Sequence, residues 1–246
     1  MTISIWLGNV GAGKTACAVR HMAMTNMHFY SNIITKGLKN NTSMSKEMIM
    51  KDTEYTDKIT GKPKAKLLVN KEFWEEQVKK YQPISVIVDE AHALINARRG
   101  MSKKSLAFMD WLAMIRRVLG SVDNVGSLIL ISQLERRIDV IAKEMCNEVR
   151  YFICHYTKTC QVCGCYWSEN NESCEIRFEC PRCTSDGIKK TNILIECWHF
   201  QSMDNFVRWK YLGIKRQYYR HYYIKNITDY FPMYNTLQWE NLLSDE

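Results

Sequence analysis

The sequence predicts an α/β fold with a central, mostly parallel β-sheet. Three short runs rich in Ile, Val and Leu have the length and composition of buried strands: residues 3–7, 84–88 and 127–132. Helical patterns separate these runs, at residues 14–25, 71–80 and 103–119. Because parallel neighbours need a crossover connection, this alternation of strands and helices indicates βαβ units.

Length and composition restrict the class of protein. The chain has 246 residues, 46% hydrophobic and 24% charged, which suits one large globular domain with a small attached module. No apolar run approaches the roughly 18 residues that span a bilayer, and residues 1–7 lead straight into a glycine-rich loop. We therefore expect no membrane span, no signal peptide and a cytoplasmic location. In such a reducing compartment the ten cysteines favour metal binding over disulfides.

The formal net charge of +8 is unevenly distributed. Residues 1–150 hold 23 of the 34 Lys and Arg but only 15 of the 26 Asp and Glu, whereas residues 151–246 are neutral. A basic first part weakly favours a polyanionic partner such as nucleic acid. Greater solubility explains the same excess equally well.

Weaker patterns cover the rest of the chain. We expect a short strand at 28–32 and a helix at 138–146. Residues 36–66 hold eight Lys, four acidic residues and no sustained periodicity, which predicts a long solvated loop, either mobile or facing DNA. Two further strand-like runs, 149–156 and 192–201, flank a cluster of cysteines and predict a β-hairpin with a metal site at its tip.

Residues 8–15 fit the phosphate-binding pattern G-x-x-x-x-G-K-[ST], with a predicted strand before them and a helix after them. Glycines let backbone N–H groups point at phosphate oxygens, and the helix N-terminus adds partial positive charge. Lys14 is expected to neutralise the β and γ phosphates of ATP, and the Thr15 hydroxyl to bind Mg²⁺. The candidate nucleotide-binding residues here are Gly8, Asn9, Val10, Gly11, Ala12, Gly13, Lys14 and Thr15.

Asp89 and Glu90 follow the buried strand 84–88, at the edge where ligands bind in open α/β sheets. Asp89 is expected to bind the nucleotide and hold its Mg²⁺, and Glu90 to polarise the attacking water, which predicts hydrolysis. His92 is interpreted as a helix-start residue that packs near the site. Gln133 follows the strand 127–132 and is a candidate contact for the γ-phosphate or that water; an ordinary strand-end glutamine is the alternative.

Basic residues crowd the segment before the strand 127–132. They are Arg98, Arg99, Lys103, Lys104, Arg116 and Arg117, and Arg136 and Arg137 form a second pair after Gln133. A helical face with this much charge is usually solvated. The functional alternative is that one arginine reaches the phosphate bound by a neighbouring subunit, as an arginine finger.

Two cysteine pairs indicate a zinc ribbon. Cys160 and Cys163 form a C-x-x-C pair, and 16 residues separate them from a second pair, Cys180 and Cys183. Four thiolates leave no open position, so the predicted Zn²⁺ site is structural. Cys165 or Cys174 could replace a ligand. Cysteines in apolar segments are expected to be core residues: Cys17, Cys146, Cys154 and Cys197.

Residues 208–223 interleave basic and aromatic side chains. Such a segment can stack on bases and pair with phosphates, or it can pack on the core. Packing is favoured, because tyrosines at i, i+4 spacing (Tyr218 with Tyr222, Tyr219 with Tyr223) suggest a docked helix.

Taken in order, these motifs resemble the FtsK/HerA superfamily of DNA-pumping ATPases, with viral genome-packaging ATPases and the zonular occludens toxin-like proteins of filamentous phages as the closest-looking branches. The resemblance covers about 1–156 and resumes at 192–201. It is carried by the residues 8–15, 84–90, 116–117 and 130–133, and Tyr234-Asn235-Thr236 is similar to a signature near the end of such proteins. The resemblance implies a RecA-like core and an arginine acting in trans, which favours Arg116 or Arg117.

The resulting expectation is a RecA-like P-loop NTPase with a zinc-ribbon module on a β-hairpin. Residues 1–156 are assigned to the ATPase core, 157–191 to the zinc ribbon, and 192–246 to a returning strand and a C-terminal segment on the core. The expected function is an ATP-driven motor that translocates double-stranded DNA as a hexameric or pentameric ring during viral genome packaging, in the host cytoplasm, with a capsid or portal-vertex protein as a further partner. Alternatives are a cellular HerA-like translocase, a phage-type assembly and extrusion ATPase, or a nucleotide-switched zinc-ribbon binding module.

Overall fold

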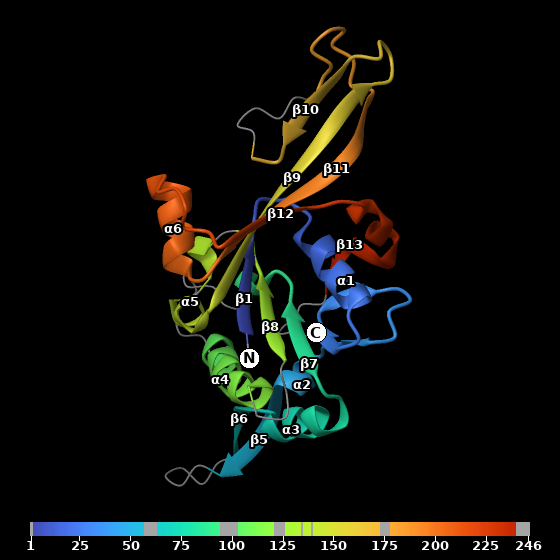
Figure 1. Cartoon of the computed structure of the whole chain (residues 1–246). Helices are drawn as coiled ribbons and strands as arrows, with labels where there is room; N and C mark the ends of the chain where they lie inside the picture. Colours follow the sequence, from blue (N-terminus) through green and yellow to red (C-terminus); the bar gives the residue numbers. More distant parts are fainter. Residues whose placement is uncertain are drawn as a thin grey trace.

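A nine-stranded sheet forms the centre of the protein (Figure 1). The computed structural model describes residues 2–56, 63–93, 103–120, 126–133, 135–138, 140–172 and 178–239. The strand order is β12-β11-β9-β1-β8-β7-β2-β4, and β10 pairs with β9. The six neighbours from β9 to β4 are parallel, whereas β11, β12 and β10 are added antiparallel. The predicted mostly parallel α/β sheet is therefore confirmed.

Apart from β4, for which no strand was predicted, the strands of the parallel part are close to their predicted positions. They are β1 (Thr2–Leu7), β2 (His28–Ser31), β4 (Asn41–Ser43), β7 (Ile84–Val88), β8 (Ser127–Ile131) and the first half of β9 (Glu148–Cys160). All five side chains of β7 are buried, as expected for a central strand with both faces covered. Because β7 and β8 are neighbours, the residues that follow them meet at one edge of the sheet.

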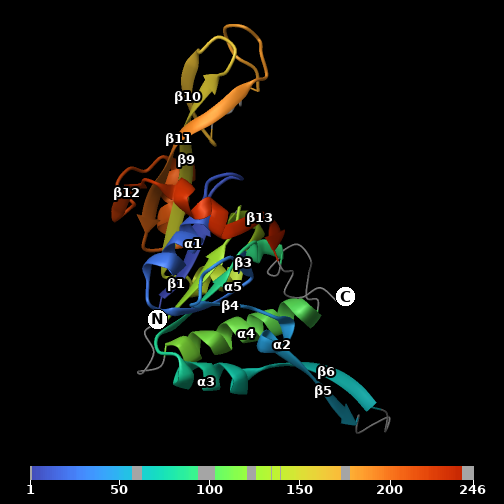
Figure 2. The ribbon, with the colours of Figure 1, turned by 90° about the vertical axis from the view of Figure 1, so that its right-hand side faces the viewer.

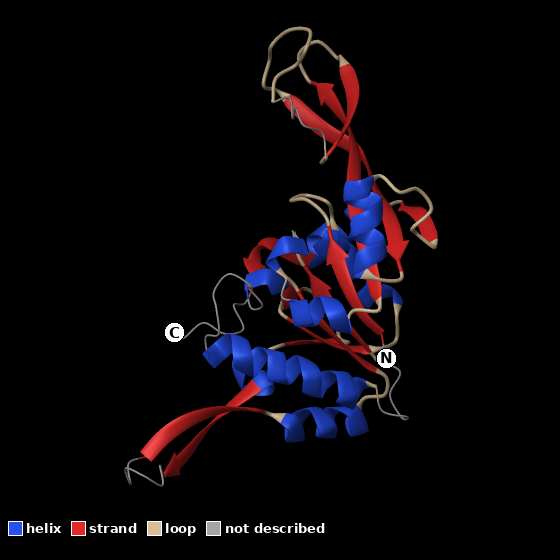
Figure 3. Ribbon diagram, turned by 90° about the vertical axis from the view of Figure 1, so that its left-hand side faces the viewer, coloured by secondary structure: helices blue, strands red, loops and turns tan. Residues whose placement is uncertain are grey.

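Helices cover both faces of the sheet and divide the core in two (Figure 3). One face carries α3 (Lys71–Lys80), α4 (Lys103–Leu119), α5 (Val140–Met145) and α6 (Met203–Leu212), whose large apolar side chains include Trp74, Trp111 and Phe206. The other face carries α1 (Lys14–Met24) and the 3₁₀ helix η3 (Ile227–Met233). Among the described residues, no helix is long and apolar enough to cross a membrane.

A long arm projects from one end of the sheet (Figure 1). It consists of the second half of β9, its antiparallel partner β11 (Ile188–Phe200) and β10 (Tyr166–Asn170). The predicted hairpin around the cysteines is confirmed, but its strands are longer than expected and run without interruption from the core into the arm. The three-part division of the chain at residues 156 and 191 stays a prediction.

The interpretation of residues 36–66 as one long loop is wrong. This segment contains β4, the short helix α2 (Lys46–Ile49), the strand β5 (Met50–Thr56) and the start of β6 (Pro63–Val69). β5 and β6 pair antiparallel as a ribbon that points away from the arm, at the opposite end of the molecule (Figure 2). A two-stranded ribbon is held by backbone hydrogen bonds between its strands, so it needs no apolar periodicity of the kind that sequence analysis detects.

The interpretation of residues 218–223 as part of a docked helix is also wrong. After α6 the chain forms β12 (Arg220–Ile224), which pairs antiparallel with β11 at the edge of the sheet. Buried His199 of β11 lies 3.2 Å from the hydroxyl of Tyr219 and 3.1 Å from that of Tyr222. The segment does pack on the core, as expected, but it does so as a strand paired with the sheet. Its tyrosine and histidine side chains lie on the surface of a β-sheet, an environment that aromatic residues favour.

Candidate functional site

The phosphate loop connects β1 to α1 and requires glycine at two positions. Gly13 caps α1 in the left-handed conformation, with φ of 79°. Gly8 has φ of 151°, and a Cβ atom there would lie 2.5 Å from the carbonyl oxygen of Phe152 in β9. Only glycine therefore lets the loop leave β1 this close to the neighbouring strand.

Lys14 is the first residue of α1, and it is only 7% exposed. Its ammonium donates hydrogen bonds to the carbonyl oxygens of Gly8 (2.7 Å) and Asn9 (3.0 Å), which holds the charge within the loop. Burial lowers the pKa of Lys14, while the carboxylates of Asp89 and Glu90 act in the opposite direction. The loop thus presents a desolvated positive charge together with the backbone N–H groups of a helix N-terminus, an arrangement suited to phosphate.

Asp89 and Thr15 form the second part of the site. The Thr15 hydroxyl donates a hydrogen bond of 2.7 Å to Oδ2 of Asp89, which follows β7 and is 8% exposed. Burial raises the pKa of Asp89, although the bond from Thr15 opposes this effect. A hydroxyl and a carboxylate are hard oxygen ligands, so the pair fits a Mg²⁺ ion bound with a nucleotide.

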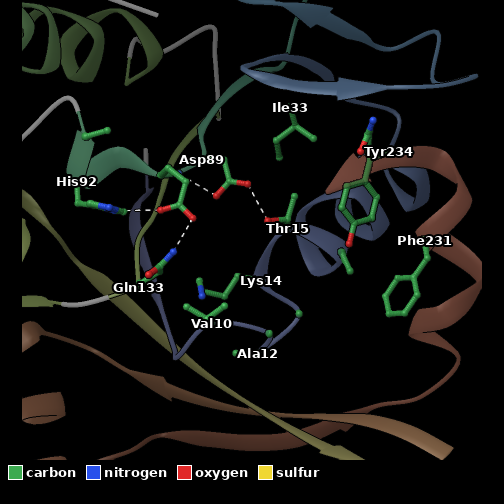
Figure 4. A pocket seen from close by; sticks show the side chains of 16 residues that line it. Val10, Ala12, Lys14, Thr15, Ile33, Asp89, His92, Gln133, Phe231 and Tyr234 are labelled. Atoms are coloured by element: carbon green, nitrogen blue, oxygen red, sulfur yellow. Dashed lines mark hydrogen bonds and ion pairs between the residues drawn. The ribbon is translucent and has the colours of Figure 1, made fainter. Parts of the chain in front are cut away.

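Glu90 is held from two sides (Figure 4). Nε2 of Gln133 donates to one carboxylate oxygen at 3.0 Å, and Nδ1 of His92, in the 3₁₀ helix η1 (Ala91–Ala93), lies 3.1 Å from the other. Burial alone would raise the pKa of Glu90, but the interactions with His92 and Gln133 outweigh it and leave this pKa below its ordinary value. Its backbone φ of 51° is unusual for a residue with a side chain and is typical of functional positions.

Two residues around these carboxylates contribute more to the site than the sequence indicated. His92, interpreted as a packing residue, contacts Glu90 directly. Asn32 was missed: it lies between β2 and β3 (Ile33–Thr35), is 1% exposed, and makes two hydrogen bonds with the backbone of Asp89. Its Nδ2 donates to the Asp89 carbonyl (2.9 Å) and its Oδ1 accepts from the Asp89 N–H (2.7 Å), which fixes the end of β7.

One cavity of ≈ 590 Å³ is lined by Lys14, Thr15, Asp89, Glu90, His92 and Gln133. The phosphate loop forms one wall, and the residues that follow β7 and β8 form another. The remaining wall comes from Ile33 and from the C-terminal Phe231, Tyr234 and Asn235. β13 (Tyr234–Trp239) pairs antiparallel with β3, which brings this distant segment to the site. Tyr234 and Asn235, which resemble part of a signature near the end of such proteins, thus line the site.

The candidate arginines that the structure describes, Arg116, Arg117 and Arg136, do not line this cavity. Arg116 and Arg117 are exposed on the last turn of α4, and Arg117 borders a separate hollow of ≈ 710 Å³ between α3 and α4. Among the described residues that line the nucleotide cavity there is no arginine. Arg136 is exposed and lies 3.6 Å from Glu135. The structure does not describe the side chains of the remaining candidates, which are Arg98, Arg99, Lys103, Lys104 and Arg137.

The four predicted cysteines meet at the tip of the arm. Their sulfur atoms all lie within 4.8 Å of one another, and Sγ–Sγ distances are 3.6 Å for Cys160 with Cys183 and for Cys163 with Cys180. Sulfurs on a tetrahedron at the usual Zn–S distance of about 2.3 Å lie about 3.8 Å apart, so the cluster fits a zinc ion.

The two cysteine pairs have the same backbone geometry. The N–H four residues after the first cysteine of each pair donates to that cysteine's carbonyl, from Gly164 to Cys160 (3.0 Å) and from Thr184 to Cys180 (2.9 Å). Both donors have positive φ, 71° and 57°. Cys165 takes part in the first turn through its carbonyl, which accepts from the Cys160 N–H as the Ser185 carbonyl accepts from the Cys180 N–H (both 2.8 Å), but its sulfur is not among the four that meet. Cys174 lies outside the described residues. The cysteines expected in the core are buried: Cys17, Cys146, Cys154 and Cys197.

The strands of the arm contact the phosphate loop directly. Asn171, just after β10, accepts a hydrogen bond of 3.2 Å on its carbonyl oxygen from the Asn9 side chain. Its own side chain accepts from the Cys154 N–H of β9 at 2.7 Å. A Cβ at Gly13 would lie 2.6 Å from Cδ1 of Ile195 in β11. The loop is therefore packed against both strands that continue to the cysteine cluster.

Comparison with known proteins agrees with this geometry. Residues 2–155 match the family model described as zonular occludens toxin (Zot). Similar solved structures include the N-terminal domain of zonular occludens toxin from Neisseria meningitidis (13% identity, 95% of this chain and 98% of that chain, TM-score 0.49). Another is the genome packaging NTPase B204 from Sulfolobus turreted icosahedral virus 2 in complex with ATP-gammaS (11% identity, 61% and 74%, TM-score 0.36). Among curated proteins no significant match was found. The phosphate loop between β1 and α1, at the edge of a mostly parallel sheet, is the arrangement of a P-loop NTPase fold. Since the family model covers more than half of the chain, the protein belongs to the Zot family.

Proposed function

We propose that this protein is an ATP-hydrolysing motor that translocates double-stranded DNA, as part of viral genome packaging. One observation carries the proposal: a phosphate loop, a hydroxyl–carboxylate pair and an oriented glutamate share one cavity, and the loop is packed against a projecting arm. A motor needs both parts, a site that distinguishes nucleotide states and an element that responds to them.

Each polar residue of the cavity has a proposed role in hydrolysis. The loop N–H groups and Lys14 bind the β and γ phosphates of ATP. Thr15 and Asp89 hold Mg²⁺, which supplies charge neutralisation for the phosphate oxygens. Glu90 accepts a proton from the attacking water, because its lowered pKa keeps it ionised near neutral pH.

Gln133 provides a route from the nucleotide to the rest of the protein. Its amide bonds to Glu90 and it follows β8, whose neighbour β1 leads into the phosphate loop. Loss of the γ-phosphate changes the partners available to Glu90 and Gln133. Movement of the phosphate loop is then passed to the arm through Asn171, Ile195 and Phe152.

DNA as the partner is supported by the charge distribution and by the motifs. The excess of positive charge lies within residues 1–150, and the order of motifs resembles DNA-pumping ATPases. We propose residues 1–156 as the ATPase core, 157–191 as a zinc-binding tip and 192–246 as its return to the core. A capsid or portal-vertex protein is proposed as the fixed partner against which DNA moves, in the host cytoplasm.

DNA dependence of ATP turnover tests the motor. At low salt, where phosphate contacts are strongest, we expect double-stranded DNA to raise the ATPase rate several-fold. We also expect ATP-dependent displacement of a third strand annealed to the duplex, which single-site binding cannot produce. An ATPase rate that does not change when DNA is added, together with no strand displacement, would contradict translocation and favour a nucleotide-switched binding module.

A ring is proposed because the cavity lacks an arginine of its own among the described lining residues, while Arg116 and Arg117 are exposed on α4. Arg116→Ala or Arg117→Ala is expected to lower turnover by about 10³-fold or more, as for other arginine fingers. Adding Lys14→Ala subunits, which are dead at their own site but keep the arginine, should restore activity. Arg208→Ala, on the exposed surface of α6, is the control. Full activity in a monomer would rule the ring out.

A second candidate is an assembly and extrusion ATPase of the filamentous-phage type. The Zot family match favours it. It uses the same site chemistry and differs in what the arm engages. This candidate would be supported if a coat or assembly protein stimulated ATP turnover and DNA did not change it.

A further inference from the structure

The cavity has two chemically different ends. At one end lie the charged and polar groups of Lys14, Asp89, Glu90 and Gln133. At the other lie the rings of Phe231 and Tyr234. Figure 4 shows both rings on the opposite side of Thr15 from His92 and Gln133, whose side chains flank Glu90.

The direction of a bound nucleotide follows from this arrangement. Hydrolysis requires the γ-phosphate to lie near Glu90, and Lys14 to lie between the γ and β phosphates. The triphosphate then crosses the N-terminus of α1 at Thr15, and the nucleoside continues to the side away from Glu90. That side is the one lined by the two rings.

The rings are held in place by backbone contacts. β13 pairs with β3, with Tyr234 opposite Thr35, and the Lys36 N–H donates a hydrogen bond of 2.7 Å to the Met233 carbonyl. Tyr234 is 8% exposed, and burial raises its pKa to about 12, so its hydroxyl stays protonated and able to donate a hydrogen bond. Phe231 is 38% exposed, which leaves a ring face accessible.

A second hollow adjoins the first at the same rings. It measures ≈ 450 Å³ and is lined by Lys36, Phe231, Pro232, Tyr234 and Asn235. Phe231, Tyr234 and Asn235 line both hollows, so there is room beside the rings for a flat group larger than the phosphates. A nucleobase is a flat group of this kind, with apolar faces that stack on aromatic rings and polar edges.

We propose that Phe231 and Tyr234 form the nucleobase subsite of this protein. Phe231 stacks on the base, and Tyr234 forms the wall between the base and the phosphate end. The inference rests on the proposed use of a nucleoside triphosphate and extends it, because it makes the C-terminal segment 227–239 part of the nucleotide site. Stacking area makes a purine the preferred base.

Comparison of ATP with inorganic tripolyphosphate, each with Mg²⁺, tests the subsite. Tripolyphosphate has the same phosphates and no base. Phe231→Ala is expected to weaken ATP binding about tenfold, within the usual range for loss of one base–aromatic stack, and to leave tripolyphosphate binding unchanged. Phe231→Tyr should keep ATP binding within about twofold of wild type, whereas Phe231→Leu, which keeps apolar volume without a π-face, should weaken it. UTP should bind wild type more weakly than ATP.

Phe178→Ala is the matched control, since Phe178 is 78% exposed near the cysteine cluster. It should bind both ligands as wild type does. Unchanged ATP affinity in Phe231→Ala would overturn the base subsite and leave the proposed function intact. Equal loss of ATP and tripolyphosphate would also overturn it, since the ring would then only support the loop. Failure of wild type to bind either ligand would overturn the proposed function itself.

Discussion

Replacement of Glu90 by glutamine is expected to preserve nucleotide binding and to lower ATP turnover by about 10²–10⁴-fold, the usual contribution of a general base. The amide has nearly the shape of the carboxylate but cannot accept the proton of the attacking water. Phosphate binding depends on Lys14 and the loop N–H groups, which the change does not touch. Steady-state turnover and equilibrium binding of ATP, measured on the same preparation, separate the two effects.

The control for this prediction is Glu76→Gln, an exposed carboxylate on α3, which should turn over ATP within about twofold of wild type. The pH dependence gives a second readout. Because the pKa of Glu90 is lowered, its carboxylate becomes protonated at a lower pH than an ordinary glutamate does. The fall in turnover on acidification should therefore begin at a lower pH than the ordinary pKa of glutamate would give. Wild-type turnover in Glu90→Gln would remove Glu90 from the mechanism.

Loss of zinc is expected to unfold the tip of the arm and to spare the ATPase core. The tip has little apolar interior: Val162, Tyr166 and Phe178 around the cysteines are 71%, 76% and 78% exposed. A module of this size without a core usually needs a metal or disulfide, and zinc contributes about 10–16 kcal/mol in comparable small sites. Wild type should contain one Zn²⁺ per chain, whereas the double variant Cys180→Ser, Cys183→Ser should contain none and should still bind ATP.

Elemental analysis and hydrogen exchange measure these outcomes separately. Exchange should accelerate around residues 160–168 and 178–190 in the double variant and stay slow in the parallel part of the sheet. Cys165→Ser is the matched control, because the sulfur of Cys165 is not among the four that meet, and it should retain zinc. Protein purified without chelator that contains no zinc would refute the metal site. If Cys165→Ser lost zinc and Cys163→Ser kept it, the metal site would stand and only the choice of ligands would be wrong.

The parts that the sequence determined by itself are local in the chain. The phosphate loop and the glutamate after β7 are short motifs bounded by their own strand and helix, so a few consecutive residues are enough to identify them. The cysteine pairs are similar, since each pair forms its turn alone and only the meeting of the two pairs needs the hairpin. Gln133 could be placed near Glu90 because consecutive parallel strands end at one edge of a sheet.

Only the tertiary structure decided the remaining features, because they join segments far apart in sequence. Asn32 supports Asp89 across 57 residues, and Tyr234 reaches the phosphate loop through pairing of β13 with β3. Asn32 does not stand out in the sequence, and Tyr234 stands out only as part of a terminal signature, because the place of each at the site depends on which strands become neighbours. The ribbon β5–β6 and the edge strand β12 were misassigned for a related reason. Hydrogen bonds to a neighbouring strand and packing in the finished sheet determine that these segments are strands. The pattern of apolar residues within each segment does not show which strand will be its neighbour.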